Sequence, residues 1–165
     1  RNSENMSPYS IIELAQESSS HLDKIREEFG IEIVTSHSIR DQRGMLSSLE
    51  FNDELPFIPM RLFYVQDVPI GFTRGGHAHK HCQQILFSIA DECEISLKKN
   101  SASIRIKLDS PSLGIYVPST IWADLKFKSQ NSLLLVLASL PYDELDYLRD
   151  YQEFVAYQTE NSGEV

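Results

Sequence analysis

From residue 31 onward the sequence follows a strand-like pattern, which limits the folds that the chain can adopt. Apolar and polar residues alternate with a period of two, and alternate residues of a strand share one face. Nine segments show the pattern: 31–35, 45–51, 60–68, 77–89, 92–97, 103–108, 115–117, 121–127 and 133–139. Turn-forming stretches separate them at 41–44, 68–71, 99–101, 109–112 and 118–119. Short strands at this spacing, with no helix between them, predict an all-β fold, an antiparallel sandwich or jelly-roll barrel.

The residues before this region predict a helix. Apolar side chains recur at steps of three and four from Pro8 to Phe29, with Ser7 placed as the N-cap and Gly30 placed to end the helix. We expect an amphipathic helix that packs on its own domain, with a linker helix or a subunit contact as the second interpretation. Residues 1–7 are polar and are predicted to be disordered.

The C-terminal part is aromatic and acidic. Residues 142–157 are predicted to form a short helix or an irregular segment packed over the barrel, and residues 158–165 a disordered tail. The predicted organisation is therefore a disordered start and helix over 1–30, one barrel domain over 31–157 and a tail over 158–165.

Length, charge and cysteine content narrow the functional classes. A chain of 165 residues fits one domain with a sizeable core, and its net charge of −9 argues against nucleic acid as a partner. No apolar run approaches the roughly 20 residues of a membrane span, and no secretory signal is visible. Cys82 and Cys93 lie in apolar context and are predicted to be buried free thiols in a reducing cytoplasm. The start at Arg1 suggests either processing or a domain cut from a longer polypeptide.

The sequence RGGHAHKH at residues 74–81 is the main chemical signal. It places His77, His79 and His81 at alternate positions of a predicted strand, so all three are expected to point to the same side. Such a cluster indicates a metal site, a proton relay or a polar surface.

Metal binding is the less favoured of these interpretations. Metal sites of jelly-roll barrels combine His-x-His with a nearby Glu and a distant third His. Here Gln83 or Gln84 stands at the acidic position, and the later segment 112–122 contains no histidine. Three histidines along one strand would spread over about 13 Å, which fits a tetrahedral ion badly. We therefore predict no metal.

Acid–base chemistry fits the motif better. Imidazoles with an ordinary pKa of about 6.5 carry protons at neutral pH. With Tyr64 nearby, His77 and His79 would move a proton between adjacent carbons of a carbonyl compound, and arginines such as Arg74 would neutralise an enediolate or a phosphate.

Several motifs together resemble one enzyme family. They are DQRGML at 41–46, RLFYV at 61–65, RGGHAHK at 74–80, YVP at 116–118, LLVLAS at 134–139 and YDELDYLRDY at 142–151. The combination resembles the sugar 3,4-ketoisomerases of the WxcM-like group, which are cupin-fold enzymes acting on dTDP-4-keto-6-deoxyglucose. The resemblance covers residues 31–157.

The resemblance implies an activity and partners. The enzyme would move the keto group of a dTDP-linked sugar from C4 to C3 without metal or cofactor. It would be a cytoplasmic homodimer with exchanged N-terminal strands. Its product would pass to an aminotransferase and an N-acyltransferase, giving 3-acetamido-3,6-dideoxyhexoses for cell-surface glycans such as O-antigen. Because family members occur fused to an acyltransferase, a domain of a bifunctional protein is a further expectation.

The resemblance also implies site residues. His77 and His79 match the paired active-site histidines, and Tyr64 matches the active-site tyrosine. Predicted substrate-binding residues are Arg74, Arg61, Arg43, Lys80, Gln84, Tyr116 and Trp122. The working hypothesis makes His79 the base at carbon, with His77 and Tyr64 moving the oxygen protons, and the two histidines could exchange roles.

Three alternatives remain open at this point. A metal-dependent cupin enzyme would bind metal stoichiometrically. A non-catalytic sugar-nucleotide sensor would keep the arginines but tolerate loss of His77 or His79. An epimerase-like cupin would use a single histidine base with a tyrosine acid. The configuration of the product at C4 also stays open, and Ala123 is a position that could influence it.

Overall fold

The structure is a computed structural model that describes residues 11–162. The first half contains β1 (Ile11–Glu13), α1 (Ser19–Phe29), β2 (Glu32–Thr35), β3 (His37–Asp41), β4 (Gly44–Ser48), β5 (Arg61–Val65) and β6 (Thr73–His79). The second half contains β7 (Gln84–Ala90), β8 (Cys93–Lys99), β9 (Ala102–Leu108), β10 (Leu113–Val117), β11 (Trp122–Phe127), β12 (Leu133–Ala138), the 3-10 helix η1 (Glu144–Asp146), β13 (Tyr147–Leu148) and α2 (Tyr151–Asn161).

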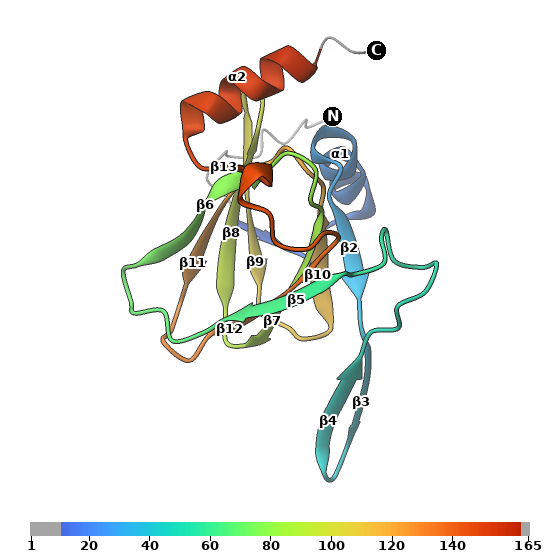
Figure 1. Cartoon of the computed structure of the whole chain (residues 1–165). Coiled ribbons are helices and arrows are strands. Elements are labelled where there is room, and N and C mark those ends of the chain that lie inside the picture. Colours follow the sequence, from blue (N-terminus) through green and yellow to red (C-terminus); the bar gives the residue numbers. More distant parts are fainter. Residues whose placement is uncertain (1–10, 163–165) are drawn as a thin grey trace.

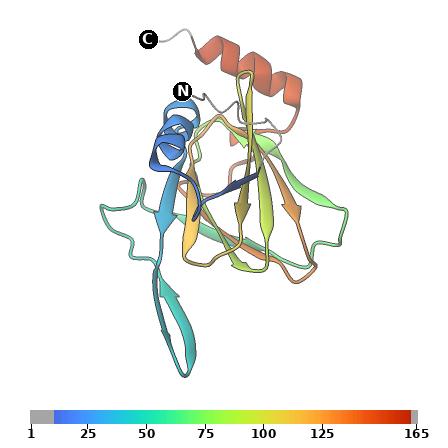
Figure 2. The ribbon, with the colours of Figure 1, turned by 180° about the vertical axis from the view of Figure 1, so that it is seen from behind.

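Two antiparallel sheets face each other and form the body of the molecule (Figure 1). The first has the strand order β1-β9-β8-β11-β6-β13, with β1 added in parallel to β9, and the second has the order β2-β10-β7-β12-β5. Helix α2 lies across one end of the body, and α1 lies beside β2 (Figure 2). The predicted all-β jelly-roll architecture with an N-terminal helix is confirmed.

Alternation along the strands separates an inner from an outer apolar surface. On β7, Leu86 packs into the main core between the sheets, whereas Ile85 and Phe87 pack into a second cluster with Leu137. The segment 49–57 covers this outer cluster with Leu49, Leu55 and Phe57. The period of two therefore fixes which side chains enter the barrel.

Among the described residues, neither helix is long and apolar enough to span a membrane.

The prediction of one helix from Pro8 to Phe29 is wrong in its first part. Ile11–Glu13 is strand β1, paired with β9, and the helix begins at Ser19 after the N-cap Ser18. The open edge of β9 offers the backbone partners, and the side chain of Ile12 becomes buried there. Gly30 ends the helix as predicted, with a φ angle of 73°. Ser7 and Pro8 lie outside the described residues.

The predicted strand 77–89 is divided in two. Strand β6 ends at His79 and β7 begins at Gln84, so His81 leaves the strand and is exposed. The backbone N–H of Lys80 donates to the carbonyl of Asp146, and the N–H of His81 donates to the carboxylate of the same residue. These bonds draw the chain away from strand geometry, so the prediction that three histidines point to one side is wrong for His81.

Two further elements differ from the prediction. Strand β3 was not predicted, and it forms with β4 a separate two-stranded sheet that projects from the body (Figure 1). Helix α2 continues to Asn161, beyond the predicted end at residue 157. Its Phe154 packs with Trp122 and Leu148 on the outer side of β6 and β11.

Candidate active site

A β-bulge in β6 positions the two histidines. Gly75 and Gly76 have φ angles of 84° and 69°, in the left-handed region that glycine adopts without strain. On the neighbouring strand β11, Ala123 pairs with His77, and the next residue of β11 pairs with Gly75, so Gly76 is extra. A bulge re-aims the side chains next to it. Here it precedes His77 and His79.

We expect Gly75→Ala to disrupt this arrangement. A Cβ atom on Gly75 would lie 2.7 Å from the carbonyl oxygen of Ala123, in addition to the strained φ angle. The substitution should cost about 1–3 kcal/mol of unfolding free energy and lower the activity. Gly76→Ala is the matched control, because its Cβ would meet only the Asp124 carboxylate, at 3.6 Å. Both variants share the strain of a positive φ angle, so equal losses in thermal unfolding and turnover would contradict a specific role for the close contact between Gly75 and Ala123.

The histidines point toward the end of the barrel interior. Between them Ala78 packs on the opposite side of β6, in the cluster under α2. His77 and His79 consequently face away from α2, and His79 reaches Gln84 of β7. Strand β13 completes this end, because Tyr147 pairs with His79 across the sheet.

His79 is held by one hydrogen bond on each ring nitrogen. Its Nδ1 lies 3.0 Å from Oδ2 of Asp146, and its Nε2 lies 3.3 Å from Nε2 of Gln84. The carboxylate only accepts, so Nδ1 carries the proton, and Nε2 accepts from the Gln84 amide. Nε2 is therefore the basic nitrogen of this ring, and a substrate proton would replace the long contact to Gln84.

Asp146 is a buried carboxylate with three donors. Besides the His79 ring it accepts the backbone N–H of His81 at 2.7 Å and of Cys82 at 3.2 Å. It belongs to η1, whose first turn is capped by the Asp143 side chain. Three hydrogen bonds offset the cost of burying the charge and fix the carboxylate against the imidazole.

Aromatic rings pack around the pair. The rings of His77 and His79 meet edge to face, with centroids 5.1 Å apart. The Tyr147 ring lies 5.0 Å from His77 and 4.4 Å from His79, and the guanidinium of Arg149 lies over it at 4.3 Å. Arg149 is held by Glu144, whose pKa it lowers to about 2. Tyr147 thus shields both imidazoles from one side.

Burial makes both imidazoles neutral at neutral pH. Desolvation and the neighbouring His77 lower the pKa of His79 to about 4, and Asp146 offsets only part of their effect. Desolvation also lowers the pKa of His77. Neutral imidazoles can accept protons, so both histidines are available as bases rather than held as cations.

Arg61 supplies positive charge next to the histidines. It lies on β5 with Phe63 on the inner face, and its charge contributes to the lowered pKa of His79. Its Nε atom is buried without a hydrogen-bond partner among the described residues, and so is Nδ1 of His77. The guanidinium Nε–H of Arg61 is a donor, and an unpaired buried donor is rare, so it favours a polar ligand atom in this space.

Three predicted site residues lie on the surface. Tyr64 follows Phe63 on β5, so it faces outward and is 60% exposed. Arg43 lies at the turn of the β3–β4 hairpin, where it pairs with Asp41, and its side chain is 90% exposed. Arg74 lies on the exposed first half of β6. These residues are not brought to the histidines within one chain.

Three other predicted residues make contacts elsewhere. Trp122 is buried under α2, 5.6 Å from the Phe154 ring. The ammonium group of Lys80 lies 5.9 Å from the ring centre of Tyr157 on α2. Tyr116 faces the outer apolar cluster and donates its hydroxyl to Gln83. Of the predicted set, the structure brings together His77, His79, Gln84 and Arg61.

The sequence interpretation missed Asp146, Tyr147, Glu144 and Arg149 as site residues. All four belong to the YDELDYLRDY motif, which contributed to the resemblance but was assigned only a packing role. The available signal was a dense acidic and aromatic segment predicted to lie over the barrel.

One group of side chains has the composition of a metal site. A ring nitrogen of His79, Sγ of Cys82 and a carboxylate oxygen of Asp146 all lie within 4.8 Å of one another, and all three residues are buried. This set differs from the strand-borne histidines that the sequence interpretation tested and rejected.

Two antiparallel sheets that enclose a His–Asp pair, a second imidazole and an inward arginine define a small cupin-type barrel suited to proton transfer. Comparison with known proteins specifies the family. The family model "WxcM-like, C-terminal" (FdtA) matches residues 29–159. The chain belongs to this family, as the sequence motifs predicted.

The relatives are sugar-nucleotide isomerases. The TDP-4-oxo-6-deoxy-alpha-D-glucose-3,4-oxoisomerase of Aneurinibacillus thermoaerophilus is 36% identical over 76% of this chain and 90% of its own length. The sugar 3,4-ketoisomerase QdtA of Thermoanaerobacterium thermosaccharolyticum, solved with TDP, has a TM-score of 0.76 and 32% identity, over 79% of this chain and 95% of that one. The TDP-quinovose 3,4-ketoisomerase WlaRB of Campylobacter jejuni has a TM-score of 0.71 and 39% identity, over 76% and 97%.

Proposed function

We propose that this protein is a TDP-sugar 3,4-ketoisomerase that moves the keto group of a 4-keto-6-deoxyhexose from C4 to C3 without a metal. The observation that carries the proposal is the His79 ring, with Nδ1 protonated on Asp146 and an unprotonated Nε2 on the interior side, where it contacts the Gln84 amide. A neutral buried base beside a second imidazole and an arginine matches the demands of an enediolate reaction.

The proposed steps conserve all atoms. Nε2 of His79 removes the proton from C3, which the C4 ketone acidifies, and the electron pair forms an enediolate between C3 and C4. The guanidinium of Arg61 stabilises the negative oxygen, an interaction worth about two to three orders of magnitude in rate when well aimed. The proton returns to C4, and His77 carries the O3 proton to O4, leaving a ketone at C3.

Proton NMR in D2O with TDP-4-keto-6-deoxyglucose and excess EDTA tests the proposal. Exchange of the C3 proton together with a new 3-keto product supports it, and the coupling at C4 reports the configuration. Activity that appears only after metal is added would favour a metal-dependent cupin. Nucleotide binding without exchange or product in either condition would favour a sugar-nucleotide sensor.

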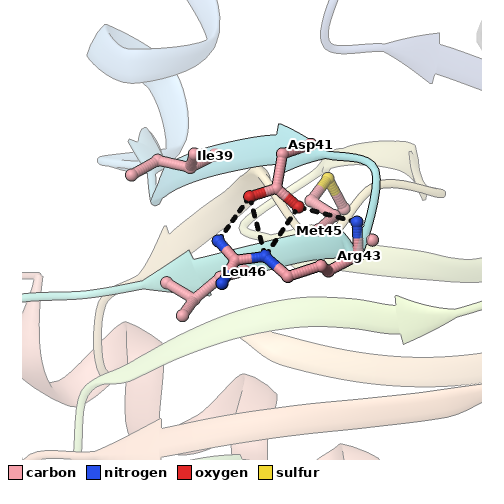
Figure 3. A pocket seen from close by; sticks show the side chains of 6 residues that line it. Ile39, Asp41, Arg43, Met45 and Leu46 are labelled. Atoms are coloured by element: carbon pink, nitrogen blue, oxygen red, sulfur yellow. Dashed lines mark hydrogen bonds and ion pairs between the residues drawn. The ribbon is translucent and has the colours of Figure 1, made fainter.

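We also propose a homodimer that exchanges the β3–β4 hairpin. Among the described residues β3 and β4 form a sheet of their own, and Ile39 and Leu46 are 54% and 63% exposed. Figure 3 shows both side chains on the hairpin together with the Asp41–Arg43 ion pair. These residues line a hollow of about 380 Å³. An isolated hairpin is marginally stable, so its apolar residues need a cover.

The outer face of β5 offers a matching surface. Leu62 and Tyr64 are 54% and 60% exposed there, next to the outer apolar cluster. In the proposed dimer, the hairpin of one chain covers β5 of the other, so Tyr64 and Arg43 would meet across the interface. This arrangement would give both residues a role that a single chain does not.

We predict that Leu46→Glu converts the dimer to a monomer, because a carboxylate cannot be buried unpaired in an apolar interface. Light scattering coupled to size exclusion measures the mass. Leu145→Glu is the control, since Leu145 is 81% exposed and lies on η1. A wild-type chain that is monomeric at micromolar concentration would rule out the exchange.

The cellular setting follows from the proposed activity. Two buried free thiols, Cys82 and Cys93, fit the cytoplasm, where nucleotide sugars would be converted for cell-surface glycans. Fusion to an acyltransferase domain stays a prediction from the resemblance.

A further inference from the structure

The geometry points to a zinc site formed by His79, Cys82 and Asp146, whose occupation switches off the His79 base. The inference concerns regulation of the proposed active site and rests on the proposed function for its effect on activity. Zinc binding itself can be tested without any substrate.

The three ligand atoms form a compact and buried set. A ring nitrogen of His79, Sγ of Cys82 and a carboxylate oxygen of Asp146 lie within 4.8 Å of one another, and the residues are only 6%, 3% and 8% exposed. Nδ1 is the ring nitrogen that faces the carboxylate, at 3.0 Å. Nitrogen, thiolate and carboxylate are the ligands that zinc takes in proteins, and water is the usual fourth ligand where the protein supplies three. With one thiolate and one carboxylate, the bound dication is neutralised, as burial requires.

The surroundings already orient these ligands. The backbone N–H of His81 donates to Oδ1 of Asp146, whereas the N–H of Cys82 donates to Oδ2, the oxygen that also faces the His79 ring. The Gln84 amide contacts Nε2 of His79, and after a flip of the amide its oxygen would accept a hydrogen bond from a protonated Nε2. Hydrogen bonds of this kind fix the tautomer and direction of a metal-binding imidazole.

Zinc and catalysis compete for the same imidazole. In the free protein Nδ1 holds the proton and Nε2 is the base. When zinc takes Nδ1, the ring stays neutral only with its proton on Nε2, directed at Gln84. The base is thereby lost, while Cys82 releases its thiol proton to solvent. One proton leaves per zinc bound, and no oxidant or reductant is needed.

Isothermal titration with ZnCl₂ tests the binding step on the full chain. We expect one site, release of about one proton when buffers of different ionisation enthalpy are compared, and affinity weakened at least about 10- to 100-fold in Cys82→Ser. Cys93→Ser is the matched control, because both thiols are buried and donate to the carbonyl of the next residue. Circular dichroism checks that both variants fold.

Cobalt(II) gives a second readout. A thiolate-to-cobalt charge-transfer band in the wild type, absent in Cys82→Ser, would identify the sulfur ligand even if one variant is less stable. Zinc affinity unchanged in Cys82→Ser, or no binding to the wild type at micromolar zinc, would overturn the inference.

The effect of zinc on activity is tested separately from zinc binding. Zinc should inhibit the isomerase, EDTA should restore it, and the zinc concentration for half inhibition should rise about 10- to 100-fold in Cys82→Ser. Magnesium should not inhibit, because it prefers oxygen ligands. Tight zinc binding with full activity would overturn the switch, whereas absence of any isomerase activity in the presence of EDTA would contradict the proposed function and leave the binding result intact.

Discussion

His79→Asn is expected to reduce kcat by about two to four orders of magnitude, the range typical of a positioned acid or base. The side chain is the one described imidazole with a hydrogen-bonded Nδ1 and an Nε2 directed into the barrel. Asparagine keeps a polar group near Asp146 but offers no basic nitrogen. Exchange of the substrate C3 proton in D2O is the direct measurement, and it should be lost together with product formation.

Two variants separate catalysis from structure in this experiment. His81→Asn is the control, because its side chain is exposed and has left the strand, and its turnover should stay near that of the wild type. His77→Asn should keep C3 exchange but slow product formation, since His77 is assigned to the oxygen protons. Exchange that survives in His79→Asn and disappears in His77→Asn would reverse the two roles.

The sequence alone predicted the inner part of the site because strand alternation is a local rule. On β6 it put His77 and His79 on one side, and on β5 the same rule places Arg61 and Phe63 inward. Tyr64 was assigned to the site by its motif, although alternation after Phe63 directs it outward. Because Tyr64 faces outward, it could contact substrate only in the active site of a second subunit, as in the proposed dimer.

The missing part of the site depends on contacts that are distant in sequence. Asp146 meets His79 across 67 positions, and no local periodicity specifies which loop carboxylate will reach a given strand. The same contact explains why the predicted strand beyond His79 breaks, because Asp146 takes backbone donors that a strand would pair with a neighbour. A single long-range interaction therefore accounts for both a missed site residue and a wrong strand.

The helix prediction failed for a different reason. Apolar steps of three and four continue from residue 11 to 29, so periodicity gives no boundary at Ser18. The free edge of β9 determines where the helix begins, because it pairs with Ile11–Glu13 and only the later residues form the helix. Strand pairing with β9 therefore outweighed the weak helix propensity of these residues.

Asp146→Asn is expected to lower kcat by about two to four orders of magnitude with little change in KM. The carboxylate makes no assigned contact with substrate, and it acts by holding the Nδ1 proton of His79, so that Nε2 stays basic. An amide turned toward the ring with its nitrogen would favour the opposite tautomer, which has no lone pair on the interior side. The substitution should also lower the free energy of unfolding by about 1–3 kcal/mol, because one acceptor oxygen cannot accept from three buried donors.

The measurements must separate tautomer from unfolding, because both effects reduce turnover. Asp143→Asn is the control, since asparagine caps η1 as well as aspartate does. Nitrogen-15 NMR of the labelled imidazoles reports which nitrogen of His79 carries the proton. A kcat loss that disappears after correction for the folded fraction would mean that Asp146 only shapes the chain after β6. A kcat loss accompanied by a changed tautomer would mean that the carboxylate makes His79 a base, and that any ligand competing for Nδ1 inhibits the enzyme.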